Sequence, residues 1–180
     1  MNWIEEAAIK LKKKNQVLFA KNSDYLQDLN ILFQSQNHRV LTLWAFDFAA
    51  ESIKRLEEKY PQEHRPKEAL VSAQDWAAGN VKMRFAQRKI LDCHAFAKEI
   101  NNKEDIAACH AVGHACAVVH TAKHAIGYQI YDLTSIIYRM GMENCVKAVE
   151  KRKQDYIDRL YYLIENQDDY KHEWAPFMKK

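Results

Sequence analysis

Glycine and proline are scarce in this chain, with 4 Gly and 3 Pro in 180 residues. Because these residues interrupt helices or mark turns, their scarcity predicts long helices joined by short connections. No segment shows the alternation of apolar and polar residues that is typical of a strand. Hydrophobic residues make up 48% of the chain, which is enough for a folded core. We therefore expect an all-α, single-domain bundle of about six to eight helices over residues 1–166, followed by a C-terminal tail at 167–180.

Several function classes lack their sequence signatures. There is no glycine-rich phosphate loop, helix-turn-helix or nucleophile elbow. The four cysteines contain no Cys-x-x-Cys pair and are interpreted as free thiols. The net charge is only +3, and no basic stripe with interleaved aromatics indicates nucleic-acid binding. No signal peptide or transmembrane stretch is recognisable. We expect a cytoplasmic protein with no nucleic-acid partner, no membrane contact and no cofactor.

The most unusual stretch is Cys109–Tyr128, CHAVGHACAVVHTAKHAIGY, which holds half of the 8 histidines. His110 and His114 form one pair four residues apart, and His120 and His124 form another. On one continuous helix all four would fall within an arc of about 120°. The residues between them are mostly alanine and glycine, so neighbouring helices can approach closely. We expect a central helix that begins near residue 103 and continues towards residue 140, with Gly127 as a break or a close contact.

Three roles are open for this histidine face. Neutral imidazoles ligate metals, so His110, His114, His120 and His124 are a candidate metal site. The stretch contains no Asp or Glu, so any carboxylate ligand would have to come from elsewhere. Histidines also serve as acid–base catalysts, or as members of polar networks at helix contacts. Because buried polar groups are usually partnered rather than reactive, we prefer the structural network.

Asp47 and Glu51 lie one turn apart on a helix predicted at 38–60. Two like charges at this spacing repel each other unless each is paired with a cation. Glu51 has Arg55 four residues on, whereas Asp47 requires a cation from another helix. We expect one polar cluster between helices, or a partner site, and Asp47→Ala would then cost a few kcal/mol. The residues assigned to this cluster are Asp47, Glu51, Arg65, Trp76, Arg88, His94, His120 and His124.

The remaining helices are predicted at 2–18, about 25–33, 66–78, 81–100 and 142–166. Asn37 and Asn80 are candidate N-caps, and Gly79 and Gly141 are candidate helix stops. In the tail, Trp174 and Phe177 are expected either to pack on the bundle or to contact a partner.

Three segments in this order resemble a known family. They are LWAFDFAAE at 43–51, RPKEA at 65–69 with WAAG at 76–79, and GHA at 113–115 through AKHA at 122–125. This pattern is similar to that of the all-helical putative immunity proteins (immunity-protein-five-like) of bacterial polymorphic toxin systems. The resemblance covers about residues 38 to 130, and departs from the family pattern at Lys67 and Lys98, where the family has arginine. The matching positions are Trp44, Asp47, Arg65, Pro66, Trp76, Gly79, His94, Gly113, His120 and His124.

The resemblance implies a binding module rather than an enzyme, with a cognate toxin protein as its partner. Many immunity proteins are acidic because their nuclease targets are basic, so the charge of +3 argues against a strongly basic nuclease. The alternative from the residues alone is a metal-binding helical bundle or metalloenzyme. The toxin, the binding surface and the oligomeric state are left open.

Overall fold

A computed structural model describes residues 2–180 and confirms the all-α fold. Within this range there are eight α-helices and three short 3₁₀ segments, and no strand. No helix among these residues has both the length and the apolar character that crossing a bilayer would require. The helices are α1 (Trp3–Lys12), α2 (Gln27–Gln34), α3 (His38–Lys59), α4 (Arg65–Ala78), α5 (Met83–Phe96), α6 (Lys103–Ala117), α7 (His124–Met140) and α8 (Val146–Asn166), with 3₁₀ segments at Asp24–Leu26, Gln167–Asp169 and Pro176–Lys179.

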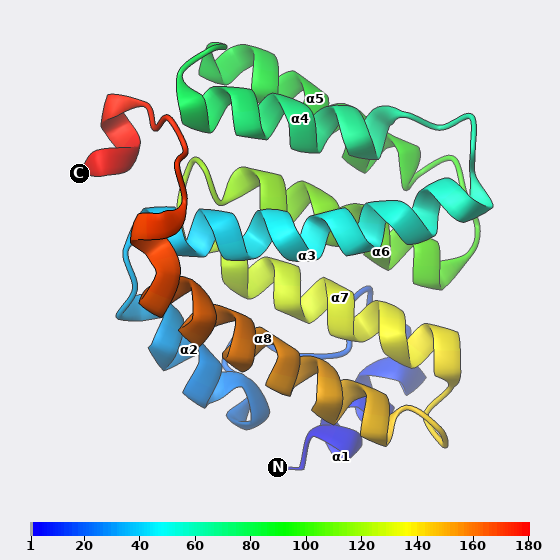
Figure 1. Cartoon of the computed structure of the whole chain (residues 1–180). Helices are drawn as coiled ribbons and strands as arrows, with labels where there is room; N and C mark the ends of the chain where they lie inside the picture. Colours follow the sequence, from blue (N-terminus) through cyan, green and yellow to red (C-terminus); the bar gives the residue numbers. More distant parts are fainter. Residues whose placement is uncertain (1) are drawn as a thin grey trace.

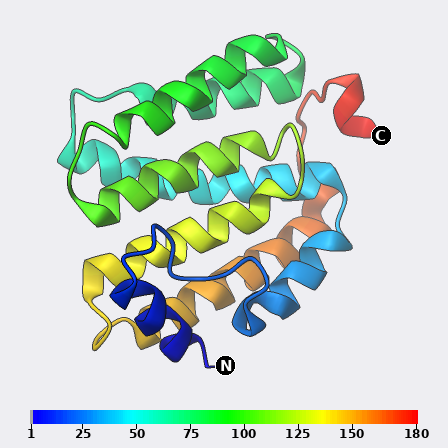
Figure 2. The ribbon, with the colours of Figure 1, turned by 180° about the vertical axis from the view of Figure 1, so that it is seen from behind.

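Helix α6 lies in the middle of the bundle, as its small side chains predict. It packs against α3, α4, α5 and α7. The α4–α5 hairpin lies on one side of it, and α7 and α8 lie on the other (Figures 1 and 2). Every alanine of α6 before Ala117 is buried, and so is Gly113. These small side chains allow the neighbouring helices to pack close to α6.

The expected continuous helix through residues 103–140 is wrong. Helix α6 ends at Ala117, and α7 begins at His124 and folds back along it as an antiparallel hairpin. The consecutive β-branched residues Val118 and Val119 weaken the helix at this point. The Val118 carbonyl, freed at the helix end, lies 2.5 Å from Nε2 of His38 on α3. Gly127 is not the break, but lies inside α7 at a close contact.

Local signals set several helix ends as predicted. The Asn37 side chain caps α3 by accepting a hydrogen bond from the Val40 amide at 2.9 Å. Gly79 ends α4 in the left-handed conformation, with φ of 86°. Asn80, however, does not cap α5, because its amide donates to the Asp75 carbonyl and so belongs to the end of α4. Helix α5 begins only at Met83.

The C-terminal tail packs on α4. The Ala175 amide donates to the carbonyl of Ala77 at 2.8 Å, and Met178 is buried. The Phe177 ring lies 5.9 Å from the Trp76 ring. One of the two alternatives for the tail aromatics, packing on the bundle, therefore describes Phe177.

Candidate functional site

Four histidine rings from three helices form a continuous row. Nδ1 of His94 on α5 lies 2.8 Å from Nδ1 of His110 on α6, and Nδ1 of His114 on α6 lies 3.1 Å from Nδ1 of His124 on α7. The His94 and His114 rings link the two pairs, with centroids 6.1 Å apart. The Tyr131 ring contacts both His110 and His114 at 5.2 Å. We call His94, His110, His114 and His124 the imidazole row.

Two glycines leave the space that these rings occupy. A Cβ atom on Gly113 would lie 2.4 Å from Cε1 and Nε2 of His94. A Cβ atom on Gly127 would lie 2.3 Å from Nδ1 of His114. Both distances are far below van der Waals contact. The row therefore depends on glycine at these two helical positions, which explains why a residue of low helix propensity stands there.

The imidazole row is held neutral. Burial, with a further effect of the neighbouring imidazoles and Lys98, lowers the pKa of His94 to about 4. Burial and the neighbouring histidines lower the pKa of His114 to about 3. Burial likewise lowers the pKa values of His110 and His124. In each neutral pair one Nδ1 donates and the other accepts, so each pair presents one N–H and one lone pair at its two Nε2 atoms.

The stability of the fold is expected to fall as the pH drops from about 6.5 towards 4. In the unfolded chain these histidines bind protons near their ordinary pKa of about 6.5. The folded row binds them only at lower pH, because the pKa of His94 is lowered to about 4 and that of His114 to about 3. The unfolded state therefore binds more protons in this window, which lowers the free energy of unfolding. Urea unfolding at a series of pH values measures the slope.

Carboxylates also titrate at the acidic end of this window, so the slope requires a control. The variant H94Q/H114Q is expected to show a weaker pH dependence between pH 6.5 and 5 than the unmodified chain. The variant H172Q replaces an exposed histidine of the tail and should keep the full slope. If H94Q/H114Q retains the unmodified slope, the row is not its source.

A cavity of about 550 Å³ lies beside the His114–His124 pair. Its walls come from the segment before α2, the end of α2, the start of α3 and the α6–α7 hairpin. The residues that line it are Lys21, Phe33, Gln34, Gln36, Leu41, His114, Ala122, Lys123, His124, Ile126 and Gly127. The volume is within the range of about 300–1,000 Å³ that is typical of small-molecule sites.

The eight residues assigned to one polar cluster do not form one. The structure divides them among separate contacts, and each charged member pairs with a residue outside the predicted set. Asp47 pairs with Arg159 at 2.6 Å, so its cation does come from another helix. Glu51 pairs with Arg152 at 2.5 Å and not with Arg55.

The other predicted members are equally dispersed. Arg65 pairs with Glu63 and Glu99, each at 2.6 Å, and Arg88 pairs with Asp92 on the exposed surface at 3.4 Å. Trp76 and His120 do meet, with stacked rings 6.2 Å apart. His94 and His124 belong to the imidazole row.

The candidate metal site at His110, His114, His120 and His124 is not assembled. The helix break places His120 in the turn, where its ring stacks on Trp76 rather than joining the row. No group of three or more His, Cys, Asp or Glu side chains among residues 2–180 is arranged to hold a metal ion. A structural zinc site requires four protein ligands and a catalytic zinc site three. The arrangement of these donors therefore does not fit the hypothesis of a metal site.

Sequence reasoning missed the most buried ionic group, Asp132 on α7. Its carboxylate is fully buried and accepts hydrogen bonds from Nε of Arg152 at 2.7 Å and from the hydroxyl of Tyr156 at 2.5 Å, both on α8. Arg55 and Ser52 on α3 also contact it, at 3.3 and 3.4 Å. This network therefore joins α3, α7 and α8.

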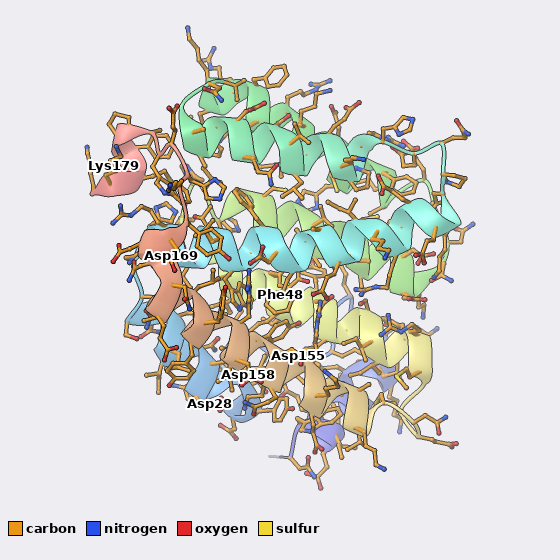
Figure 3. All side chains as sticks on the ribbon, viewed as in Figure 1. Asp28, Phe48, Asp155, Asp158, Asp169 and Lys179 are labelled. Carbon is orange, nitrogen blue, oxygen red and sulfur yellow. The ribbon has the colours of Figure 1, made fainter. Side chains whose placement is uncertain are left out.

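Burial alone would raise the pKa of Asp132, but the charge and hydrogen bond of Arg152 hold that pKa below its ordinary value. The Arg152 guanidinium also lies 4.6 Å from the centre of the Phe48 ring. Figure 3 shows Phe48 where α3 meets α8, near Asp155 and Asp158. A signal for the network was present, because Asp132 is the only acidic residue between His124 and Met140 in the sequence and lies between Ile130 and Leu133.

A family model described as Imm-5 like putative immunity protein matches residues 32–160. This span exceeds the 38–130 expected from the motifs and includes most of α8, which the motifs placed outside the resemblance. No curated protein and no solved structure matches the chain. The family match covers well over half of the 180 residues, and the chain therefore belongs to the family of Imm-5 like putative immunity proteins.

Proposed function

We propose that this chain is an immunity protein that binds a cognate bacterial toxin in the cytoplasm and neutralises it as a non-catalytic module. The observation that carries the proposal is the family match over residues 32–160. That span begins in α2 and ends in α8, so the family relationship extends to the helices that build the bundle rather than to one motif.

The chemistry of the side chains supports a binding role over catalysis. All four cysteines are buried, and burial raises the pKa of Cys109 and of Cys116 to about 12. Thiols of this kind are poor nucleophiles at neutral pH. A general base works best with a pKa near the working pH, whereas the pKa of His94 is about 4 and that of His114 about 3.

The outward face of α5 is the surface we assign to the toxin. Helix α5 lies at the edge of the bundle, and its main contacts within residues 2–180 are with α4 and α6 on its inner side (Figure 2). Its apolar residues Met83, Phe85 and Leu91 are 42%, 52% and 61% exposed. Arg84 and Arg88 lie among them, and Arg88 is one of the residues predicted for a partner site. Exposed aromatic and arginine side chains of this kind are typical of interface hot spots.

The first experiment is rescue of growth in the native host. The chain is co-expressed with each candidate toxin encoded beside it, and a tagged copy is purified under toxin-expressing conditions. The proposal predicts that one toxin is tolerated only when the chain is present, and that this toxin co-purifies in a fixed stoichiometry. If the chain protected against none of these toxins, the proposal would be contradicted.

Surface variants then test whether the outward face of α5 binds the toxin. F85E and L91E are expected to weaken toxin binding by at least about tenfold. Loss of a hot-spot side chain costs about 2 kcal/mol or more, and each variant also places a charge in the apolar contact. I31E alters an apolar side chain of α2 that is 55% exposed, and should bind the toxin as the unmodified chain does. Equal weakening by I31E would assign the contact elsewhere.

A further inference from the structure

The cavity beside the His114–His124 pair has an apolar interior. Phe33 from α2, Leu41 from α3 and Ile126 from α7 contribute to its walls, and Gly127 contributes only backbone. Figure 2 shows the segment between α1 and α2 crossing over α7, and this segment contributes Lys21 to the lining of the cavity. A small apolar body therefore fits in the space that the hairpin and its covering segment enclose.

The charges around the cavity have one sign. Lys21 and Lys123 line it, and none of its described lining residues is a carboxylate. Some lysines of the chain form ion pairs, as Lys59 does with Asp105 and Lys153 does with Asp28. Neither cavity lysine forms an ion pair within the described part of the chain. Two unpaired ammonium groups at a partly enclosed apolar space attract an anion.

The histidine pair adds hydrogen-bonding groups of both kinds. Because Nδ1 of His114 and Nδ1 of His124 lie 3.1 Å apart, the neutral pair shares one proton between these atoms. One Nε2 then carries a proton and the other a lone pair. The neutral pair itself carries no charge, so the lysines supply the charge of the cavity.

We propose that this cavity binds a small organic anion, namely a carboxylate carried on an aromatic or aliphatic body. The apolar walls enclose the body, Lys21 and Lys123 attract the carboxylate, and the histidine pair offers it an N–H donor. This site is separate from the α5 face assigned to the toxin, and its test does not depend on the toxin.

Isothermal titration of the untagged chain with naphthoate at pH 7.5 tests the proposal. We expect saturable binding at one site per chain, and markedly weaker binding of naphthol, which has the same rings without the charge. The variant K21E/K123E should weaken naphthoate binding by at least about tenfold, because carboxylates then replace both cations. A122W should also reduce binding, because Ala122 lines the cavity and the larger ring occupies it.

The matched control is K10E/K13E, which makes the same change in charge at a different surface hollow that Lys10 and Lys13 line. It should bind naphthoate as the unmodified chain does. The two lysines of the cavity are exposed, so K21E/K123E should remain folded even if A122W does not. Absence of saturable binding, equal affinity for naphthol, or equal weakening in K10E/K13E would each overturn the proposal.

Discussion

Replacing Asp132 with alanine is expected to lower the free energy of unfolding by about 3–5 kcal/mol, the usual cost of removing one member of a buried ion pair. The Asp132 side chain is fully buried, and that of its partner Arg152 is only 11% exposed. The variant would leave the Arg152 guanidinium in the bundle interior with Glu51 as its remaining counter-charge. The Glu51 side chain is 53% exposed, so solvent screens its attraction. Urea unfolding followed by circular dichroism measures the loss.

Two comparisons test whether the loss of stability comes from leaving a buried charge unpaired. In D132A/R152L no buried charge is left unpaired, because the side chains that lose a partner, Glu51 and Arg55, are 53% and 32% exposed. Most of the lost stability should therefore return. D47A removes one member of a half-exposed pair, whose Asp47 and Arg159 side chains are 40% and 32% exposed. It should cost only about 0–1 kcal/mol. This is less than a buried cluster around Asp47 would imply, and a D47A cost equal to that of D132A would refute the distinction.

The network around Asp132 ties α8 to the rest of the bundle. Arg152 and Tyr156 on α8 reach Asp132 on α7, and Arg152 continues to Glu51 on α3. Because the carboxylate accepts from both α8 side chains, a shift of α8 along α7 would break two bonds to a buried charge. The network thus holds the register of α3, α7 and α8, whereas the sequence analysis expected a polar cluster between helices to be built from a different set of residues.

Features decided by neighbouring residues were predictable. The N-cap at Asn37 and the left-handed Gly79 depend on backbone groups within a few residues. The central position of α6 follows from its small side chains. The break after Ala117 was harder to predict from the sequence, because the free Val118 carbonyl lies beside His38, which is 80 residues away in sequence. A continuous helical pattern in the sequence does not reveal such a contact.

Pairing across helices could not be predicted for the same reason. Glu51 has Arg55 one turn away, which is the local choice. In the folded chain it pairs with Arg152 instead, 101 residues on, and Arg55 contacts Asp132. The histidines also pair across helices. His94 on α5 is part of the imidazole row, whereas His120, which is closer in sequence to the other members, is not. The structure does pair polar side chains at helix contacts, but the pairs differ from the predicted cluster.

Gly127→Ala is expected to destabilise the fold, although Gly→Ala inside a helix normally stabilises it by about 1 kcal/mol. The new Cβ would lie 2.3 Å from Nδ1 and 2.7 Å from Cγ of His114. Cγ lies next to the His114 backbone, so relief requires the whole ring to move. The ring is packed against Tyr131 and paired with His124. Overpacking of this kind typically costs about 1–3 kcal/mol, which thermal and urea unfolding would detect.

A double-mutant cycle tests the cause of this reversal. In the H114A background the ring is absent, so Gly127→Ala should become stabilising, with the sign that helix propensity predicts. The variant H114A alone measures the cost of removing the ring. If Gly127→Ala were destabilising by the same amount in both backgrounds, the His114 ring would not be the obstacle. A change of sign would instead indicate that glycine at this position accommodates the His114 ring.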